Sequence, residues 1–258
     1  MRHALVTGAA GAIGGAIARE LVERHPHVKL TLVDVALDRA RVLARELTRE
    51  GEPHDARAWD LAEPAGLPEA YEALVRDRGE VDVLVNCAGI MDIRSFAGTP
   101  WARGEQLLSI DLVSPLRLMS LVTPSMLARG AGTIVNVSSM AGVTPLRGCT
   151  YYGAAKAGLA MASEIACLEL GPRGVHVVTV YPGPVRSELE RRARAQATQG
   201  VLTRLIPTGD AAPLAARVLD ACAQRRPRVF YPALYDVAGR LPGLASRFTR
   251  AVSPMPSA

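Results

Sequence analysis

The sequence predicts one α/β domain built on a doubly wound parallel sheet. Short runs rich in Val, Ile and Leu alternate with longer amphipathic stretches, which is the pattern of strands joined by crossover helices. The chain has 258 residues, of which 49% are hydrophobic, enough to bury a full core without disulfides or metal. No internal repeat, low-complexity tract or linker interrupts it, so residues 1–258 are expected to form a single domain.

Five apolar runs are predicted as strands, at residues 4–7, 30–34, 81–86, 133–138 and 175–181. A sixth run, at residues 54–60, is a weaker strand candidate because it is less apolar. The segments between them carry apolar residues at helical spacing and are long enough to be crossovers; the clearest are 12–24, 37–50, 105–128 and 152–170.

The regular alternation fades after Pro182. An arginine-rich helical stretch at 188–199 is followed by a helix near 211–224, a short strand at 228–231 and a tail punctuated by Pro and Gly. Ligands of open α/β sheets bind beyond the carboxyl ends of the strands. Residues 187–258 are therefore expected to supply substrate-covering and tail elements.

Composition excludes several classes of function. The net charge is +5, but the basic residues are scattered, which favours a solvated surface over a nucleic-acid-binding patch. The four cysteines have irregular spacing and no C-x-x-C pair, which predicts free thiols and no metal site. No stretch of 18 apolar residues and no leader-like N-terminus is present, so a cytoplasmic protein is expected.

A glycine-rich turn follows the first predicted strand. Its residues Gly8, Gly11, Ile13 and Gly14 lie where backbone N–H groups at a helix N-terminus can approach a pyrophosphate. Asp34, 20 residues beyond Gly14, is placed to accept hydrogen bonds from ribose hydroxyls and to repel a 2′-phosphate.

These residues predict a dinucleotide site that prefers NAD to NADP. Two alternatives stay open. Arg39 offers a positive charge that suits NADP, and Asp34 could instead cap the helix that begins near Leu37.

The predicted helix 152–170 carries Tyr152 and Lys156 four residues apart, and therefore on one face. Lys156 is notable because the chain uses arginine almost throughout, and its only other lysine is Lys29. An ammonium beside a phenol favours the phenolate and so lowers the phenol's pKa toward that of a general base. Ser138 and Ser139 end the preceding strand. This pattern indicates acid/base chemistry at Tyr152.

Taken in order, these motifs resemble the short-chain dehydrogenase/reductase family over roughly residues 4–190. The segments that carry the resemblance are Thr7 to Gly14, Asp60-Leu61, Asn86-Cys87-Ala88-Gly89, Ile134 to Ser139, Tyr152 to Lys156 and Pro182 to Val185. The resemblance implies a Rossmann-type fold, the family's single-domain branch, and hydride transfer between a nicotinamide and an alcohol or ketone.

The resemblance also implies residue roles. Tyr152 would be the acid/base, Ser139 would orient the substrate oxygen, and Lys156 would hold the nicotinamide ribose. The remaining cofactor contacts would come from Asp60 and Leu61 at the adenine, from Asn86, Ala88 and Gly89 at the cofactor floor, and from Pro182 and Val185 at the carboxamide.

One catalytic position departs from the family pattern. Asp111 stands where the family usually has an asparagine that helps to hold a water in the proton relay. A carboxylate near Lys156 would favour the ammonium. We expect an active enzyme with altered pH dependence, with Asp111 counted among the catalytic residues, rather than an inactive relative.

The residues that follow the catalytic motifs, such as Met140 and Val143, are mostly apolar and favour an apolar secondary alcohol or ketone as substrate. Two alternative functions stay open: a regulatory or signalling protein that binds the cofactor with little turnover, and an NADPH-dependent ketoacyl reductase.

The family resemblance implies a homodimer or homotetramer. Aromatic and arginine residues mix in the tail at 230–250, which suits packing on the sheet or on another subunit better than contact with a membrane surface.

Overall fold

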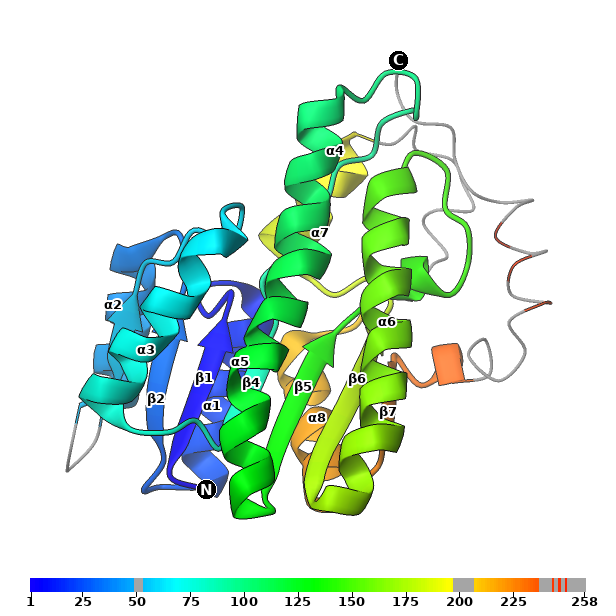
Figure 1. Ribbon diagram of the computed structural model, residues 1–258. Coiled ribbons are helices and arrows are strands. Elements are labelled where there is room, and N and C mark those ends of the chain that lie inside the picture. The colour runs from blue at the N-terminus through cyan, green and yellow to red at the C-terminus, as the bar shows by residue number, and fades with distance from the viewer. Residues whose placement is uncertain (49–52, 197–206, 237–242, 244–245, 247–248, 250–258) are drawn as a thin grey trace.

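The computed structural model describes residues 1–48, 53–196, 207–236, 243, 246 and 249. Its centre is a sheet of seven parallel strands in the order β3-β2-β1-β4-β5-β6-β7 (Figure 1). The strands are β1 (His3–Thr7), β2 (Lys29–Val33), β3 (Asp55–Arg57), β4 (Val83–Asn86), β5 (Gly132–Val137), β6 (Val175–Pro182) and β7 (Arg228–Tyr231). The predicted doubly wound α/β fold is confirmed.

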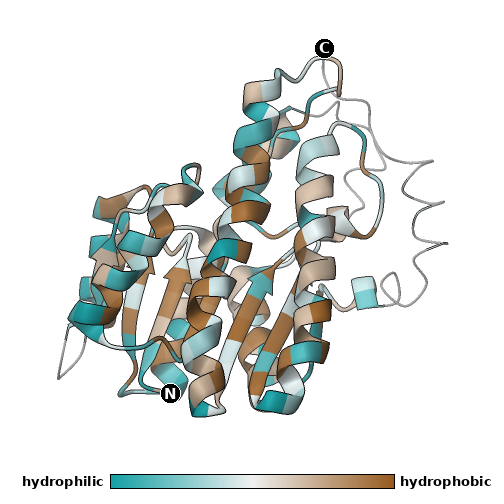
Figure 2. Ribbon diagram, viewed as in Figure 1, coloured by the Kyte–Doolittle hydropathy of each residue, from teal (hydrophilic) through white to brown (hydrophobic). Residues whose placement is uncertain are grey.

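Helices cover both faces of the sheet. They are α1 (Ala12–Arg24), α2 (Leu37–Leu47), α3 (Leu67–Arg78), α4 (Trp101–Leu108), α5 (Ser114–Arg129), α6 (Thr150–Leu170), α7 (Glu188–Ala195) and α8 (Ala211–Ala223). Apolar side chains alternate along the strands: Val6 packs in one core cluster with α1, α2 and α8, and Leu5 packs in the other with α3 and α5. Brown apolar bands therefore run along the strands beneath the helices (Figure 2).

The strand order reverses direction between β1 and β4. The chain first builds outward through β2 and β3, then returns to add β4 on the other side of β1 and continues to β7. Because all seven strands are parallel, their carboxyl ends lie at one edge of the sheet. The crevice at such a reversal is where open α/β sheets bind ligands.

The predicted helix 105–128 is longer than expected and contains an irregular turn. Residues Ser109–Val113 form a π-helical turn between α4 and α5. The stretch Trp101–Arg129 has a mean hydropathy of 1.3 over 18 residues, long and apolar enough to cross a membrane by those criteria alone. Apolar residues of this stretch belong to the hydrophobic core, because Leu118, Val122 and Met126 are fully buried against the sheet.

Several element boundaries differ from the sequence prediction. The sequence pattern did not predict α3, whose first turn contains Pro68, a residue suited to that position. Of the weaker strand candidate at 54–60, the structure contains only the three residues of β3, which is an outermost strand of the sheet and pairs with β2. The helices α2 and α7 end at Leu47 and Ala195, and the predicted extensions to 50 and 199 end outside the described residues.

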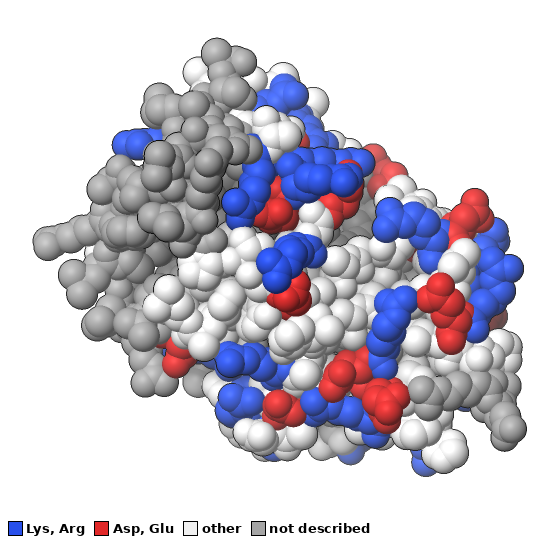
Figure 3. All heavy atoms as spheres, turned by 180° about the vertical axis from the view of Figure 1, so that it is seen from behind, with Lys and Arg blue, Asp and Glu red and all other residues white. Residues whose placement is uncertain are grey.

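Basic and acidic side chains are interspersed over the face seen in Figure 3. Several form ion pairs between elements: Arg24 on α1 contacts Asp220 on α8 at 2.7 Å, and Arg57 on β3 contacts Asp77 on α3 at 2.9 Å. Most of these groups are partly exposed, so each pair contributes little to stability.

Candidate active site

The glycine turn after β1 has backbone geometry that only glycine accommodates. Gly8 has a φ of +66°, and a Cβ on it would lie 2.7 Å from the backbone of Ala88. A Cβ on Gly14 would collide with the carbonyl of Gly8. Gly11 occupies the N-cap of α1, and Ile13 anchors the first turn of that helix against the core. The turn is thus a cradle without side chains at a helix N-terminus, which fits a dinucleotide pyrophosphate.

Thr7 fixes this cradle to the next strand along the sheet. Its Oγ1 accepts hydrogen bonds from the N–H groups of Cys87 (3.1 Å) and Ala88 (3.2 Å) and donates to the carbonyl of Val85 (3.4 Å). The sequence did not predict this role of Thr7, because the partners of its hydroxyl lie some 80 residues away. This hydroxyl holds the two cofactor segments together at the point where strand order reverses.

Asp34 and Arg39 lie on opposite sides of Ala10 in the glycine turn. The Oδ2 of Asp34 accepts from the Ala10 N–H at 2.9 Å, and Nη2 of Arg39 donates to the Ala10 carbonyl at 2.8 Å. The Oδ1 of Asp34 accepts from the N–H of Ala36, the N-cap residue of α2, at 2.9 Å. Asp34 therefore steadies both the turn and the start of α2, while its remaining lone pairs stay available to ribose hydroxyls.

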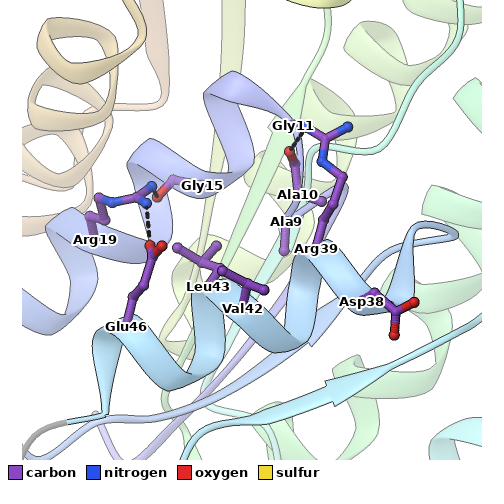
Figure 4. Close-up of a pocket in the computed structure, with 10 residues that line it drawn as sticks. All are labelled: Ala9, Ala10, Gly11, Gly15, Arg19, Asp38, Arg39, Val42, Leu43 and Glu46. Carbon is purple, nitrogen blue, oxygen red and sulfur yellow. Dashed lines mark hydrogen bonds and ion pairs between the residues drawn. The ribbon is translucent and has the colours of Figure 1, made fainter.

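A groove of about 350 Å³ opens beside this pair, between α1 and α2 (Figure 4). Arg39 reaches over its upper end to Ala10, and Arg19 pairs with Glu46 at its other end, at 2.9 Å. Its lining residues are Ala9, Ala10, Gly11, Gly15, Arg19, Asp38, Arg39, Val42, Leu43 and Glu46. The groove thus borders the glycine turn on the side of Arg39.

Asp60 and Leu61 follow β3 and connect this side of the site to α5. The Oδ1 of Asp60 accepts from the Ala62 N–H at 2.8 Å, which shapes the turn. Leu61 is buried, and its carbonyl accepts a 2.7 Å hydrogen bond from the hydroxyl of Ser114 at the start of α5. Asp60 and Leu61, which were predicted to flank the adenine, therefore lie beyond the carboxyl end of β3, at the same end of the sheet as the glycine turn.

Asn86 ends β4 and begins a buried polar chain. Its Nδ2 donates to Oδ1 of Asn136 (2.8 Å), and Nδ2 of Asn136 donates to Oγ of Ser163 on α6 (2.7 Å). The Oδ1 of Asn86 is buried and has no hydrogen-bond partner among the residues that the structure describes. This chain ties the predicted cofactor floor to the helix that carries Tyr152.

The predicted catalytic residues come together at the end of β5. Lys156 is 4% exposed; its Nζ donates to the carbonyl of Val137 at 3.1 Å and lies 5.7 Å from the centre of the Tyr152 ring. The hydroxyl of Ser138 donates to the backbone carbonyl of Lys156 at 2.7 Å and joins β5 to α6. Ser139 caps the turn after β5 by accepting from the Ala141 N–H at 3.1 Å.

The pKa of the Tyr152 phenol is raised well above its ordinary value. Burial is the largest cause, and the negative charge of Asp111 adds to it. The hydrogen bond with Ser139 acts in the opposite direction and lowers the pKa. The phenol is therefore held in its protonated form, which differs from the expectation that Lys156 lowers its pKa, because burial and Asp111 outweigh the effects that favour the phenolate.

Asp111 belongs to the π-helical turn Ser109–Val113, and this turn aims it at Lys156. Its Oδ1 accepts from the N–H of Ile90 at 2.9 Å, and a Cβ on Gly89 would lie 2.9 Å from that same oxygen. Pro115, four residues later, has no N–H to donate to the Asp111 carbonyl. π-Helical turns occur often at functional sites. That proline is a sequence signal for a break in α-helical hydrogen bonding at this point.

The segment after β6 closes over the same edge of the sheet. β6 ends at Pro182, and Val185, which is 4% exposed, forms a bridge with Gly209. Ser187 then forms the N-cap of α7, and its hydroxyl accepts from the Glu190 N–H at 3.1 Å. At the far end of α7, Oε1 of Gln196 accepts from the Ile93 N–H at 2.9 Å. This contact across 103 residues was not predicted from sequence.

The described part of the tail begins with β7, which is itself a strand of the sheet. Phe230 stacks on Tyr181 with ring centres 4.7 Å apart, and Tyr231 is buried. Arg240, Arg247, Phe248 and Arg250, which contributed to the prediction for the tail, lie outside the described residues. Among the residues that the structure does describe, no group of three or more His, Cys, Asp or Glu side chains could hold a metal ion.

The fold and this site define a dinucleotide-binding α/β protein with a Ser–Tyr–Lys group, its tyrosine and lysine buried, at the carboxyl ends of the strands. Residues 2–198 match the family described as short chain dehydrogenase. D-threitol dehydrogenase of Mycolicibacterium smegmatis is 34% identical over 206 residues, which make up 80% of this chain and 78% of that enzyme.

Two solved structures share the fold along the whole chain. A short-chain dehydrogenase from Sphingobium yanoikuyae in complex with NADPH has a TM-score of 0.81 and 29% identity, covering 100% of this chain and 98% of that one. The bulky-bulky ketone specific alcohol dehydrogenase of Comamonas testosteroni has a TM-score of 0.78 and 28% identity, covering 100% and 96%. The chain thus belongs to the short-chain dehydrogenase family of NAD(P)-dependent oxidoreductases, and the resemblance inferred from its motifs is confirmed.

Proposed function

We propose that the protein transfers a hydride between NAD(H) and an apolar secondary alcohol or ketone, with Tyr152 as acid/base. The observation that carries this proposal is the grouping of the half-buried Ser139 with the buried side chains of Tyr152 and Lys156 at the end of β5, at the same carboxyl end of the sheet as the glycine cradle. A buried phenol beside a fixed ammonium is a general acid/base arrangement.

In alcohol oxidation, the bound nicotinamide supplies the hydride acceptor. Tyr152 takes the hydroxyl proton on its phenolate oxygen, and the hydroxyl of Ser139 donates a hydrogen bond to the substrate oxygen and orients it. Lys156, anchored on the Val137 carbonyl, places its positive charge beside the phenol and favours the phenolate. In ketone reduction, Tyr152 gives its proton to the oxygen instead.

The preference for NAD follows from Asp34, because a carboxylate at the end of β2 repels a 2′-phosphate. Arg39 supports the alternative of NADP, since its guanidinium lies over the groove beside the turn. Titrating the wild type, Asp34→Asn and Arg39→Ala with NADH and with NADPH distinguishes the two cofactor preferences. We expect the wild type to bind NADH more tightly than NADPH and Asp34→Asn to reduce that difference. If the wild type instead binds NADPH more tightly and Arg39→Ala abolishes this difference, the NADPH-dependent reductase replaces our proposal.

The apolar substrate class is supported by the side chains that follow Ser139. Met140 and Tyr181 are buried in one apolar cluster, with Val143, Phe230 and Tyr235 packed against it. The ring of Tyr235 also lies against Gly183, just after β6. If these apolar side chains, which begin one residue after Ser139, face the substrate, the hydroxyls of a sugar would lack partners there, which favours an apolar substrate.

The test is NAD⁺ reduction over a panel of apolar secondary alcohols, with sugar alcohols as the contrasting set and Tyr152→Phe as the inactive control. We expect turnover of apolar alcohols that is lost in the variant. Tight NADH binding without turnover of any alcohol or ketone would instead favour the regulatory alternative, for which Asp111 is the supporting residue.

We further propose that the protein is a cytoplasmic homodimer or homotetramer. Met161, Ile165 and Leu168 form an apolar stripe on α6, with side chains that are 63%, 47% and 78% exposed. Burial of this stripe by a second copy would remove it from water. Light scattering of the wild type and Leu168→Glu tests the assembly: the variant is expected to dissociate, and a wild-type monomer would refute it.

A further inference from the structure

Asp111, Lys156 and Tyr152 meet at one buried point. A Cβ atom on Gly89 would lie 2.9 Å from Asp111 Oδ1 and 3.3 Å from Lys156 Nζ, so these two charged atoms are at most about 6 Å apart. The same Nζ lies 5.7 Å from the centre of the Tyr152 ring. One ammonium is thus shared between a carboxyl and a phenol.

One carboxyl oxygen of Asp111 accepts no hydrogen bond from any residue that the structure describes. The Asp111 side chain is fully buried, Oδ1 accepts one backbone hydrogen bond from Ile90, and Oδ2 has no hydrogen-bond partner within the described part of the chain. Burial raises the pKa of Asp111 to about 6, against the opposing effect of Lys156. The carboxyl is therefore ionised at neutral and alkaline pH, and its charge acts on its neighbours through a medium from which water is excluded.

The other titratable groups around Asp111 do not replace Lys156. Arg103 on α4 is engaged by Asp92 at 2.6 and 3.0 Å. Burial raises the pKa of the Cys87 thiol, after β4, to about 12, so the thiol stays neutral. The buried residues of α5 include no titratable side chain. Lys156 is thus the cation for which Asp111 and Tyr152 compete.

We propose that Asp111 sets the pH at which Tyr152 changes between phenol and phenolate, by competing with it for the single ammonium of Lys156. This proposal rests on the proposed role of Tyr152. A phenolate formed beside an ionised Asp111 would be the second anion next to the ammonium of Lys156. Because two negative charges in a buried site repel each other, ionised Asp111 raises the pKa of Tyr152. With Asp111 neutral, Lys156 stabilises the phenolate alone. Asp111 is in this sense a positioning residue that acts through Lys156.

The proposal predicts a particular pH dependence. Above about pH 6, where Asp111 is ionised, the wild type needs a higher pH than Asp111→Asn to form the phenolate, by about one unit or more. The rising limb of the pH–rate profile for alcohol oxidation and the falling limb of the profile for ketone reduction both report the ionisation of Tyr152. Both limbs therefore move to lower pH in Asp111→Asn. Below about pH 6 the carboxyl is neutral and the two profiles converge.

The experiment has a readout that needs neither cofactor nor turnover. Phenolate formation in the cofactor-free protein is followed by near-ultraviolet absorbance for the wild type and Asp111→Asn, each against the same protein with Tyr152→Phe. The pH profiles of oxidation and reduction are then measured for both. Glu105→Gln is the matched control, because it removes an exposed carboxylate from the adjacent helix α4.

We expect the Tyr152 titration and both kinetic limbs to shift to lower pH in Asp111→Asn and to stay unchanged in Glu105→Gln. Coincident Tyr152 titrations in wild type and Asp111→Asn overturn the proposal, as does a rate difference that persists unchanged below about pH 6. Turnover that survives Tyr152→Phe overturns the proposed function instead, and the absorbance titration still decides the influence of Asp111.

Discussion

Replacing Asp111 with asparagine should change how the stability of the cofactor-free protein depends on pH. In the folded protein the pKa of Asp111 is raised from 3.8 to about 6, chiefly by burial. The folded state therefore binds the proton more tightly than the unfolded chain does, and this stabilisation is lost as the pH rises from 3.8 to about 6. Asparagine has the shape of the protonated acid and does not titrate.

The expected magnitude follows from the pKa shift. A rise of about two units, at about 1.36 kcal/mol per unit, corresponds to about 3 kcal/mol. The stability of Asp111→Asn relative to wild type should thus increase by about that amount between roughly pH 4 and pH 6 and stay constant above. The site is fully buried, so solvent screens little of this energy.

Urea unfolding at a series of pH values measures this difference directly. Glu105→Gln serves again as the control, and its curve should run parallel to that of the wild type. If the curve of Asp111→Asn also runs parallel to the wild type across this interval, the carboxyl is not held in a site from which water is excluded, and burial does not raise its pKa.

Three further outcomes follow from other contacts. Thr7→Val removes the acceptor of two backbone N–H groups and should cost about 1–3 kcal/mol in urea unfolding, whereas Thr7→Ser should keep most of that energy. Gly14→Ala places a methyl group on the Gly8 carbonyl and should weaken NADH binding in a fluorescence titration; Gly66→Ala, where a Cβ meets nothing, should bind as the wild type does. Arg186→Ala breaks an ion pair with Asp210 at the surface and should leave the Tm unchanged, and a clear drop would mean that this exposed pair stabilises the fold after all.

Features encoded by neighbouring residues could be predicted from the sequence. The order strand, glycine turn, helix and Asp34 lies within some 30 residues, and its geometry follows from local chemistry. Tyr152 and Lys156 likewise share a face because they are four residues apart on one helix.

Features that depend on distant partners could not be predicted. The contact between Thr7 and Ala88 and the one between Gln196 and Ile93 exist only once the sheet has brought those segments together. The π-helical turn was missed for another reason. The apolar pattern runs unbroken through residues 105–128, and one extra residue in a turn leaves that pattern almost unchanged.

The π-helical turn Ser109–Val113 also makes the number of residues in this segment a determinant of the chemistry. Deleting one residue would restore α-helical hydrogen bonding between α4 and α5 and remove the wider turn that presents Asp111. Leu118 and Val122 could then keep their places against the sheet, but Asp111 would lose its position beside Lys156. An engineered exchange of this helix between related enzymes must therefore preserve its length as well as its side chains.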